Sequence, residues 1–447
     1  MSCCICRTVE VEKRESQFNK FPLKSTNLRK YFTFPDDLKS EFEIKEVIGE
    51  GNNTTVYKAK CNSTDDIVAI KVIVFPTPNE HRHDKQTTYI QSNNLEINIL
   101  KNIDNINCIH LISYYFNRHK ENNIMTDAIF LVTDYFDLSL HLAFSTKKFK
   151  FMNNMTMIKI FSFQLFKGLS YLHNTVGIAH CDIKPSNLLF NSQDCILKIC
   201  DFGTARILAR NSNSQDSNNA VNYISYLMIQ SRRKNSEQIY SDTNNNNSND
   251  SNYTDESNED TSVYLNTTTN NNDFVSQPIQ TTMPYRAPEI LYECQNIDPS
   301  AADIWSAGCV IAEILRGNGK KLFSSSKSSN NATTTLSTTK IPGGSSCTPI
   351  EQLNEIISIL GQPNLNDFDK HEQAAIIVSA KKTKSLDKML PKNTPKELLS
   401  LLKKILVFCP EERPTAEECI NSPFFDDIID RDDIQIPNGR KAPKLFR

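Results

Sequence analysis

The chain has 447 residues, of which 38 per cent are apolar, so part of its length is expected to lie outside a packed core. Its 50 basic side chains nearly balance 52 acidic ones, and a net charge of −2 gives no electrostatic reason to bind nucleic acid or an acidic membrane surface. No apolar run approaches the roughly 20 residues of a membrane-spanning helix, and 13 cysteines without paired spacing indicate free thiols in a reducing compartment, the cytoplasm and/or the nucleus.

Two stretches differ sharply from the rest in composition. Residues 209–275 contain "SDTNNNNSND", and residues 317–348 contain "SSSKSSNNATTTLSTT". Neither stretch has enough apolar surface to offset the entropy of ordering, so both are predicted to be mobile inserts. Residues 1–41 are predicted to be a disordered leader, and residues 426–447 a C-terminal tail.

Between these stretches the hydrophobic pattern is regular. Residues 42–75 read as short strands, "FEIKEVIGEG", "TTVYKAKC" and "DIVAIKVIVF", in which β-branched alternation breaks at glycines. "LEINILKNI" predicts a helix, "IFLVTDYF" a strand, and residues 156–173 a buried helix. After Asp303 nearly every periodic segment is helical. A strand-rich first part and a helical second part predict two lobes with a cleft between them.

The first chemical motif is "IGEGNNTTVY", which follows one strand and opens another. Its glycines would let backbone N–H groups approach a phosphate closely, although a Gly-x-Gly hairpin alone is more often only a turn. The strand–loop–strand setting excludes the Rossmann and P-loop motifs, which need a following helix. Lys71 closes the apolar strand "VAIK", and a buried ammonium needs a partner. An ATP phosphate and Glu96, on the next helix, are the candidates.

The second group of motifs supplies charged groups for phosphoryl transfer. In "HCDIKPSN", Asp182 is placed to accept the proton of a substrate hydroxyl, Lys184 to neutralise the transferring phosphoryl group and Asn187 to bind a metal ion. "KICDFG" follows a strand and supplies Asp201 for Mg²⁺. Each acidic residue taken singly would be a solvated loop charge, and only the ordered series indicates catalysis.

The series continues with "YRAPEIL", "DIWSAGCVIAEIL" and "EERPTAEECINSPFF". From Phe42 to Phe425, apart from the two inserts, the sequence resembles the eukaryotic protein kinases. The resemblance implies an α+β, two-lobed protein kinase fold. Its N-lobe and hinge, residues 42–136, would hold an antiparallel β-sheet plus one helix, and its C-lobe, residues 137–425, would be mainly α-helical. It also implies ATP and Mg²⁺ as cofactors and a protein as the substrate.

The resemblance also assigns residues to the nucleotide site. Thr133 would lie at the back of the adenine pocket, and Asp134 to Phe136 would form a hinge that bonds adenine through its backbone. The nucleotide-binding residues implied in this way are Ile48, Gly49, Glu50, Gly51, Val56, Ala69, Lys71, Thr133, Asp134 and Phe136. Structural roles are implied for a Glu289–Arg413 pair, for Asp303 beneath the catalytic loop, and for packed Leu100, His180 and Phe202.

Finer signals concern the subgroup. Lys184 and Thr282 resemble the serine/threonine class. Arg286 in "YRAPE", together with "PIEQLNEIISILGQP", resembles the group of cyclin-dependent and mitogen-activated kinases, with the cyclin-dependent-kinase-like branch closest. The helix around Glu96 lacks the cyclin-binding signature, which argues against a cyclin-type partner and favours a monomer. Thr54 stands where a third glycine is usual, and its side chain is expected to stiffen or lift the loop.

The largest departure is Cys181, which replaces an arginine. In kinases switched by phosphorylation that arginine clamps a phosphothreonine, and a thiol kept protonated by a neighbouring carboxylate cannot. The usual phosphosite falls near Gln277, which has no hydroxyl, beside Ser276. Together these absences predict activity without activation-loop phosphorylation. The fungal single-subunit kinases that activate cyclin-dependent kinases are similar in this respect, and their substrate is a threonine in another kinase's activation loop.

Two alternatives and one side-chain question stay open. The chain could be a pseudokinase scaffold whose Asn-rich inserts dock partners, or a kinase subunit that depends on a partner. Cys200, directly before Asp201, either faces the ATP pocket and reacts with electrophiles or is a small buried filler.

Overall fold

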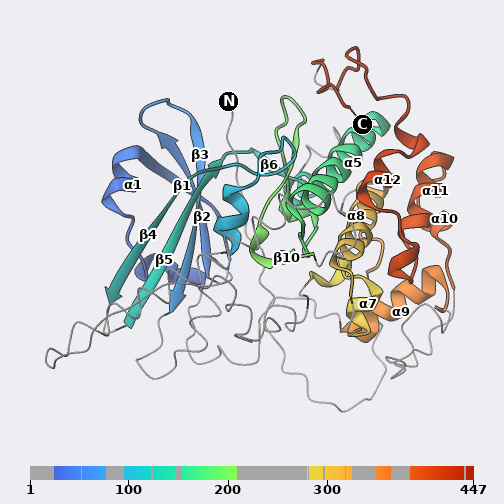
Figure 1. Ribbon diagram of the computed structural model, residues 1–447, viewed down its shortest axis with the longest axis horizontal. Helices are drawn as coiled ribbons and strands as arrows, with labels where there is room; N and C mark the ends of the chain where they lie inside the picture. The colour runs from blue at the N-terminus through green and yellow to red at the C-terminus, as the bar shows by residue number, and fades with distance from the viewer. Residues whose placement is uncertain are drawn as a thin grey trace, which may run out of the picture.

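The computed structural model describes residues 25–51, 53–76, 95–121, 124–146, 154–208, 279, 281–294, 297–317, 319–324, 348–363, 383–436 and 439–446. It has two parts, a sheet-rich lobe and a helical lobe, which lie side by side (Figure 1). The predicted α+β, two-lobed architecture is confirmed, with an antiparallel sheet in the first lobe and mainly helices in the second.

The N-lobe is built on one 5-stranded sheet with the order β1-β2-β3-β5-β4 and antiparallel pairing throughout. Side chains alternate between its two faces, as the β-branched sequence pattern requires. One face, which carries Lys71, packs on the rest of the molecule, and the other packs on the N-terminal segment. The strands are β1 (Phe42–Glu50), β2 (Thr54–Cys61), β3 (Ile67–Pro76), β4 (Leu111–Glu121) and β5 (Ile124–Asp134).

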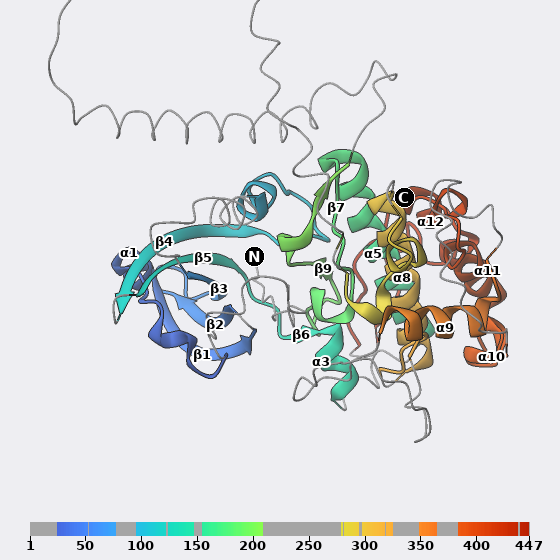
Figure 2. The same cartoon turned by 90° about the horizontal axis from the view of Figure 1, so that it is seen from below.

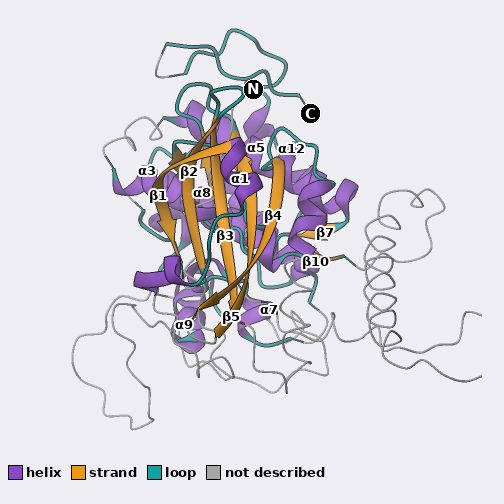
Figure 3. Ribbon diagram, turned by 90° about the vertical axis from the view of Figure 1, so that its left-hand side faces the viewer, coloured by secondary structure: helices purple, strands orange, loops and turns teal. Residues whose placement is uncertain are grey.

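The prediction of a disordered leader over residues 1–41 is wrong for its second half. Residues 25–41 fold into a 3-10 helix, η1 (Ser25–Lys30), and a short helix, α1 (Asp36–Glu41), which lie against the sheet (Figure 3). Leu28, Phe32 and Leu38 are buried there in a separate hydrophobic cluster with strand residues such as Phe130. The sequence pattern misses this segment because three or four isolated apolar residues become a core only when a sheet face lies beneath them. Residues 1–24 lie outside the described ranges.

The helix expected around Glu96 is described over residues 95–101, on the opposite face of the sheet from α1. After it, the chain crosses to the other lobe. The Ile109 N–H donates to the carbonyl of Ile199, and the Ile199 N–H donates to the carbonyl of Asn107, at 2.9 and 2.8 Å. The Asn107 side chain adds a bond to Gln164 of the second lobe at 3.0 Å. These bonds attach the start of β4 to the helical lobe.

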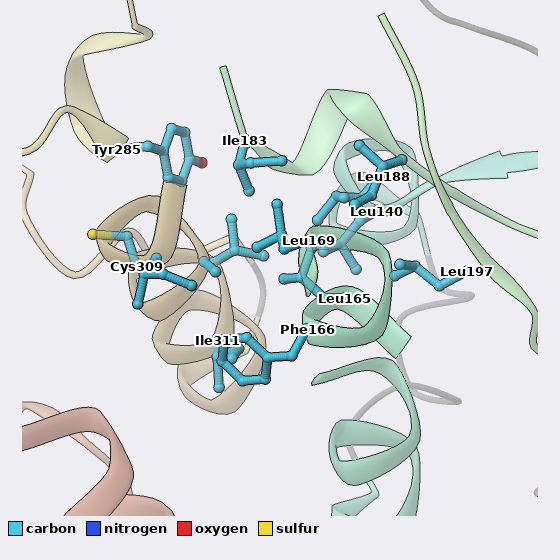
Figure 4. Packing of buried hydrophobic residues seen from close by; sticks show 14 of the residues in the cluster. Leu140, Leu165, Phe166, Leu169, Ile183, Leu188, Leu197, Tyr285, Cys309 and Ile311 are labelled. Carbon is cyan, nitrogen blue, oxygen red and sulfur yellow. The ribbon is translucent and has the colours of Figure 1, made fainter. Parts of the chain in front are cut away.

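From β5 the chain passes through β6 (Leu138–Ser139) into α3 (Leu140–Ser145) at the junction of the lobes (Figure 2). The C-lobe is centred on two buried helices, α5 (Met155–Ser170) and α8 (Pro299–Arg316). Their side chains meet in the core, where Phe166 of α5 lies beside Ile311 of α8 (Figure 4). Asn154 and Asp298 cap these helices by accepting backbone N–H bonds, which satisfies donors that a helix start leaves open.

Shorter elements complete the C-lobe around this pair of helices. Those near the cleft are η2 (Tyr171–Val176), β7 (Ile178–Ala179), η3 (Pro185–Asn187), β8 (Leu188–Phe190), β9 (Leu197–Ile199), η4 (Phe202–Thr204), β10 (Arg206–Ile207), η6 (Met283–Tyr285) and α7 (Pro288–Leu291). Those farther out are α9 (Pro349–Leu360), α10 (Leu386–Met389), α11 (Lys396–Ile405), η8 (Pro410–Glu412), α12 (Ala416–Ile420) and η9 (Pro423–Phe425).

The predicted insert at 317–348 is bounded too widely. Phe323 is fully buried and stacks on Trp305 with ring centroids 5.5 Å apart, so the chain is still part of the core there. At the other end Thr348 begins α9 through a capping box with Glu351. Residues 318 and 325–347 lie outside the described ranges, as does the whole of the other predicted insert, 209–275. Both predicted bounds were wrong because the short apolar island at Phe323 and the helix cap at Thr348 are weak signals beside a long polar run.

The C-terminal tail packs on the C-lobe in its described part. Ile428, Ile436 and Leu445 are buried, and Ile429 pairs with Leu445 in an isolated bridge. Within the described ranges, no helix combines the length and the hydropathy that crossing a membrane requires.

Candidate active site

The roof of the cleft is formed by the first three strands. The Gly51 N–H donates to the Thr54 carbonyl at 2.8 Å, which closes a tight hairpin between β1 and β2. Ile48, Gly49 and Glu50 lie at the end of β1, directly before this hairpin. Thr54 belongs to β2 and pairs with Ile73 of β3, and its hydroxyl oxygen is buried without a hydrogen-bond partner. The residue that departs from the glycine pattern is thus held as strand.

An apolar patch lies beneath this roof. Val56 and Ala69, on adjacent strands, are almost fully buried, and Ile48 and Tyr135 pack against them. Three of these four residues were predicted to bind the nucleotide, and the structure brings them together. Tyr135 lies within the predicted hinge, 134–136, but was not among the residues predicted to bind the nucleotide.

The hinge follows at the end of β5. Thr133 is buried and lies directly opposite Ala69 of β3, at the back of the patch. Asp134 ends β5, and Phe136, also buried, leads into β6 and the C-lobe. The predicted adenine-pocket residues therefore line one continuous path from the sheet to the hinge. An apolar patch next to backbone N–H and C=O groups suits a flat heterocyclic base.

Lys71 joins the two lobes through two carboxylates. Its Nζ lies 2.8 Å from Glu96 Oε1 and 2.8 Å from Asp201 Oδ1. The predicted Lys71–Glu96 pair is thus present. Burial raises the pKa of Glu96. Burial also acts to raise the pKa of Asp201, but the attraction of Lys71 and Lys184 outweighs it and lowers that pKa below its usual range. Asp201 is therefore ionised at neutral pH.

The catalytic-loop residues form a second charged cluster. Lys184 Nζ lies 2.6 Å from Asp182 Oδ2 and donates to the Thr282 hydroxyl at 2.8 Å. That hydroxyl in turn donates to Asp182 Oδ1 at 2.8 Å. Asn187 Nδ2 donates to the Asp182 carbonyl at 2.9 Å, which fixes the orientation of the amide. All four side chains are in or beside the cleft, and three of them are buried.

A buried carboxylate supports this loop from below. Asp303 of α8 accepts the backbone N–H groups of His180 and Cys181 at 2.7 and 2.8 Å, and the His173 ring lies 3.0 Å away. The His180 ring contacts Phe202 edge-on, with centroids 5.2 Å apart. Because Asp303 comes from the most buried helix, it transfers the rigidity of the core to the loop that carries Asp182.

Cys181 adopts a left-handed backbone with φ of 63° and has a buried side chain. Burial, followed by the charge of Asp303, raises the pKa of its thiol well above its usual value, which confirms the expectation that it stays protonated. Cys200 is also fully enclosed, which supports its role as a buried filler over that of a reactive thiol. Gln277 and Ser276, at the position of the usual phosphosite, lie outside the described residues.

The predicted Glu289–Arg413 pair is fully enclosed in the C-lobe. Arg413 Nη1 and Nη2 each donate to one Glu289 oxygen at 2.7 Å, so the pair is bidentate. The guanidinium also donates to backbone carbonyls, including that of Ala301 at 3.1 Å, and lies over the Trp305 ring. The pair joins α7, which carries Glu289, to the segment that follows η8, 124 residues later in the sequence.

Asn187 and Asp201 offer only oxygen ligands, the kind that Mg²⁺ prefers. A magnesium ion of this type takes most of its ligands from phosphate and water and only one or two from protein, so this residue pair fits. The glycine hairpin and Lys71 fit a triphosphate in the same way, through backbone N–H groups and a cation.

Sequence reasoning missed one charged residue near the cleft. Lys198 lies in the three-residue strand β9, and its Nζ is 3.4 Å from Asp134 Oδ2 of the hinge. The available signal was its setting, a single lysine inside the apolar run "ILKIC", where a cation requires a partner.

The fold and the two charged clusters fit one class, the two-lobed phosphotransferases, in which Asp182 would act as a base and the oxygens of Asn187 and Asp201 would suit a metal ion. A family model described as "Protein kinase domain" matches residues 42–241 and 264–425, which is more than half of the chain. The chain therefore belongs to the protein kinase family. Members of this family transfer a phosphoryl group from ATP, with Mg²⁺, to a protein.

Proposed function

We propose that this chain is an ATP- and Mg²⁺-dependent serine/threonine protein kinase of the cyclin-dependent-kinase-like type, active without phosphorylation of its activation segment. The observation that carries the proposal is the position of Lys71, which bonds Glu96 and Asp201 at once, at 2.8 Å each. A lysine shared by both lobes is the arrangement that phosphoryl transfer requires.

The chemistry of ATP and Mg²⁺ is to supply the phosphoryl group and to neutralise the charge that develops on it. Among the chain's residues, Asp182 accepts the hydroxyl proton of the substrate, and Lys184 stabilises the transferring group. Lys71, held by Glu96, orients the phosphates, and Asn187 and Asp201 hold the metal. The patch of Ile48, Val56 and Ala69, the loop residues Gly49, Glu50 and Gly51, and the hinge at Thr133, Asp134 and Phe136 bind the nucleotide.

A preference for serine or threonine is supported by the bonds among three side chains. Lys184, Asp182 and Thr282 bond to one another within 2.8 Å, so the lysine fills the space directly beside the base. A short aliphatic alcohol can reach Asp182 past this cluster, whereas a phenol has to enter from farther away. Arg286 bonds back to the Thr281 carbonyl, which supports membership of the group of cyclin-dependent and mitogen-activated kinases.

Independence from an upstream kinase is supported by Cys181. Its thiol is buried and neutral, so it offers no charge to a phosphothreonine, and its backbone N–H is bonded to Asp303 of the core helix. Such an enzyme is suited to the top of a cascade, and we propose that its substrate is the activation-loop threonine of a cyclin-dependent kinase. The described cysteines are all free thiols, in keeping with a cytoplasmic or nuclear location.

The enzyme is expressed in bacteria and treated with phosphatase, and the phosphatase is then removed. The test measures the transfer of radiolabelled phosphate from ATP by this enzyme. An unphosphorylated cyclin-dependent kinase and a generic basic protein are the acceptors, and Asp182→Asn is the variant. Loss of the base is expected to reduce kcat by about 10²–10⁴-fold. We expect the wild-type chain to label the kinase acceptor in preference to the basic protein.

Lys403→Met is the matched control for removal of a charge. It breaks an exposed pair with Asp387 on the far side of the C-lobe and is expected to leave the rate unchanged. If the phosphatase-treated enzyme transferred phosphate only after incubation with another kinase, the proposed independence from an upstream kinase would be wrong. If Asp182→Asn matched the wild type, the assignment of the base would be wrong.

A partner-dependent kinase subunit is the second candidate, favoured by one observation. Ile112, Tyr114 and Phe116 project from the same face of the edge strand β4 and are 41, 36 and 56 per cent exposed. An apolar row on an edge strand is typical of a contact surface. Purification from the native source followed by mass measurement of the intact complex separates the two candidates, because a stoichiometric partner is expected only for the second.

A further inference from the structure

A carboxylate, an ammonium and an imidazole from different parts of the chain meet behind the hinge. Asp134 ends β5, Lys198 lies in β9, and His110 directly precedes β4. Lys198 Nζ is 3.4 Å from Asp134 Oδ2, and His110 Nδ1 is 3.8 Å from Asp134 Oδ1. The cluster therefore joins the N-lobe to the strand that leads into Asp201.

Burial distinguishes the two neighbours of the Asp134 carboxylate. The side chains of Asp134 and Lys198 are 10 and 14 per cent exposed, whereas that of His110 is 60 per cent exposed. Asp134 Oδ2 is enclosed and makes no hydrogen bond of good geometry, so the ammonium of Lys198 is its one buried charge partner among the described residues. A buried carboxylate is strongly disfavoured unless it is paired, so the hinge depends on Lys198.

Lys198 also reaches the other end of the hinge. Its Nζ lies 5.9 Å from the centre of the Phe136 ring, within the range of a cation–π contact. One ammonium thus holds side chains at both ends of the three-residue hinge. The backbone of that hinge is the part proposed to bond adenine.

The strand that carries Lys198 is itself fixed. Ile199, the next residue, exchanges backbone bonds with Asn107 and Ile109 at 2.8 and 2.9 Å, and the Cys200 N–H donates to the Asn187 carbonyl at 3.0 Å. Asp201, which directly follows Cys200, is bonded to Lys71. Lys198 is therefore connected through rigid backbone to the proposed metal residues on one side and to the hinge on the other.

We propose that Lys198 is a positioning residue for the nucleotide. It sets the distance between the hinge, where the base binds, and the Asn187–Asp201 pair, where the phosphates and their metal bind. This inference rests on the proposed function, because it needs a nucleotide in the cleft. Lys198 touches no reacting atom, so its removal is expected to weaken nucleotide binding and to leave the chemistry intact.

The experiment compares Lys198→Met and Lys198→Arg with the wild-type chain. Methionine keeps the length of the side chain and removes its charge. KM for ATP is expected to rise about tenfold in Lys198→Met, with kcat and the KM for the protein acceptor unchanged, the signature of lost ground-state binding. Arginine can reach both Asp134 and Phe136, so it is expected to restore KM for ATP.

Binding is also measured directly, by titration with a fluorescent ADP analogue, so that the result does not depend on transfer. Lys403→Met serves again as the surface control. Should Lys198→Met fail to fold, the neutral pair Asp134→Asn with Lys198→Met replaces it, because no buried charge is then left unpaired. The double variant is expected to unfold cooperatively, as the wild-type chain does, and still to bind the analogue more weakly than the wild-type chain.

Three results would overturn the inference. One is unchanged analogue affinity and unchanged KM for ATP in Lys198→Met. Another is a parallel loss of kcat and of affinity for both substrates that Lys198→Arg does not restore, which would mean a general structural role. The third is a wild-type chain that binds no nucleotide, and in that case the proposed function falls too. If the wild-type chain binds nucleotide and transfers phosphate, and Lys198→Met does so equally well, only this inference is overturned and the proposed function stands.

Discussion

Single buried charges, each with a specific partner, hold the important parts of this protein together. Lys71, Asp303 and Arg413 are all buried, and each bonds groups that are far away in the sequence. The low dielectric of these sites makes a satisfied pair strong and an orphaned one costly. The chain therefore uses its few buried ions as connections between distant segments.

The Glu289–Arg413 pair allows a direct test at this scale. Glu289→Ala leaves the buried guanidinium without its carboxylate, so the free energy of unfolding is expected to fall by roughly 3–5 kcal/mol. Urea denaturation followed by the fluorescence of Trp305, the chain's one tryptophan, measures this change, because the guanidinium lies 5.1 Å from the ring centre.

The control is Asp387→Ala. Its partner is Lys403, and both side chains are 50 per cent exposed. Exposed pairs contribute only about 0–1 kcal/mol, so little change is expected. Equal effects of the two substitutions would contradict the claim that burial makes the difference.

At the scale of elements, the N-terminal segment enlarges the hydrophobic core of the N-lobe. Residues 25–41 cover the outer face of the N-lobe sheet and add an aromatic cluster to it. Phe32 contacts the Phe130 and Tyr57 rings edge-on, with centroids 5.9 and 6.4 Å away. The Thr126 hydroxyl donates to the Tyr31 carbonyl at 2.5 Å and ties the segment to β5. The sheet would otherwise expose an apolar face.

Phe32→Ala is expected to destabilise the protein by roughly 3–5 kcal/mol, the usual effect of deleting a buried aromatic ring. Thermal unfolding of the intact chain measures it. Phe116→Ala, on the same sheet, is the matched control, because its ring is 56 per cent exposed and its loss is expected to change stability little. A small effect of Phe32→Ala would show that the segment adds nothing to the N-lobe.

At the scale of the whole molecule, the two lobes differ in how deeply their side chains are buried. The outer cluster of the N-lobe is separate from the main core, which runs from the helix at 95–101 through the C-lobe to Leu445. Helix α8 is buried along nearly its whole length, from Ala301 to Leu315. By contrast, β1 and β4 are the two edges of the sheet, and most of their described residues are half-buried or exposed.

Hydrogen exchange is expected to reflect this difference. Local opening costs little at edges and approaches the free energy of global unfolding in central elements. Amides of α8 should therefore exchange more slowly than those of β1 and β4 by more than about tenfold. Mass spectrometry of peptides after deuterium labelling makes the comparison, with α5 as a second buried helix. Equal rates in α8 and β4 would contradict a molecule with one dominant core.

Much of the fold and of the site follows from local pattern. Alternation in "TTVYKAKC" and "DIVAIKVIVF" predicted strands that form as β2 and β3, and the period over residues 156–173 predicted the helix that forms as α5. The need of a buried ammonium for a partner made Glu96 and an ATP phosphate the candidates for Lys71, and the structure contains the Lys71–Glu96 pair. These inferences succeed because each depends on a few neighbouring residues.

Other features depended on residues that meet only after folding. Leu28, Phe32 and Leu38 look like scattered apolar residues in a polar leader until the sheet lies beneath them. Phe323 was assigned to an insert because its neighbours are polar, yet it stacks on Trp305. Weak local signals of this kind gain their free energy from partners elsewhere in the chain, so no window of sequence contains them.

By itself the sequence determined the identity and order of the chemical groups: a glycine hairpin, Lys71, Glu96, Asp182, Asn187 and Asp201. It also determined that Cys181 stands where a cation is usual. Only the tertiary structure decided that Lys71 bonds both carboxylates, that Lys198 lies behind the hinge, and that residues 25–41 belong to the core. The physical reason is that chemistry is a property of single side chains, whereas burial and ion pairing are properties of residues far apart in the chain.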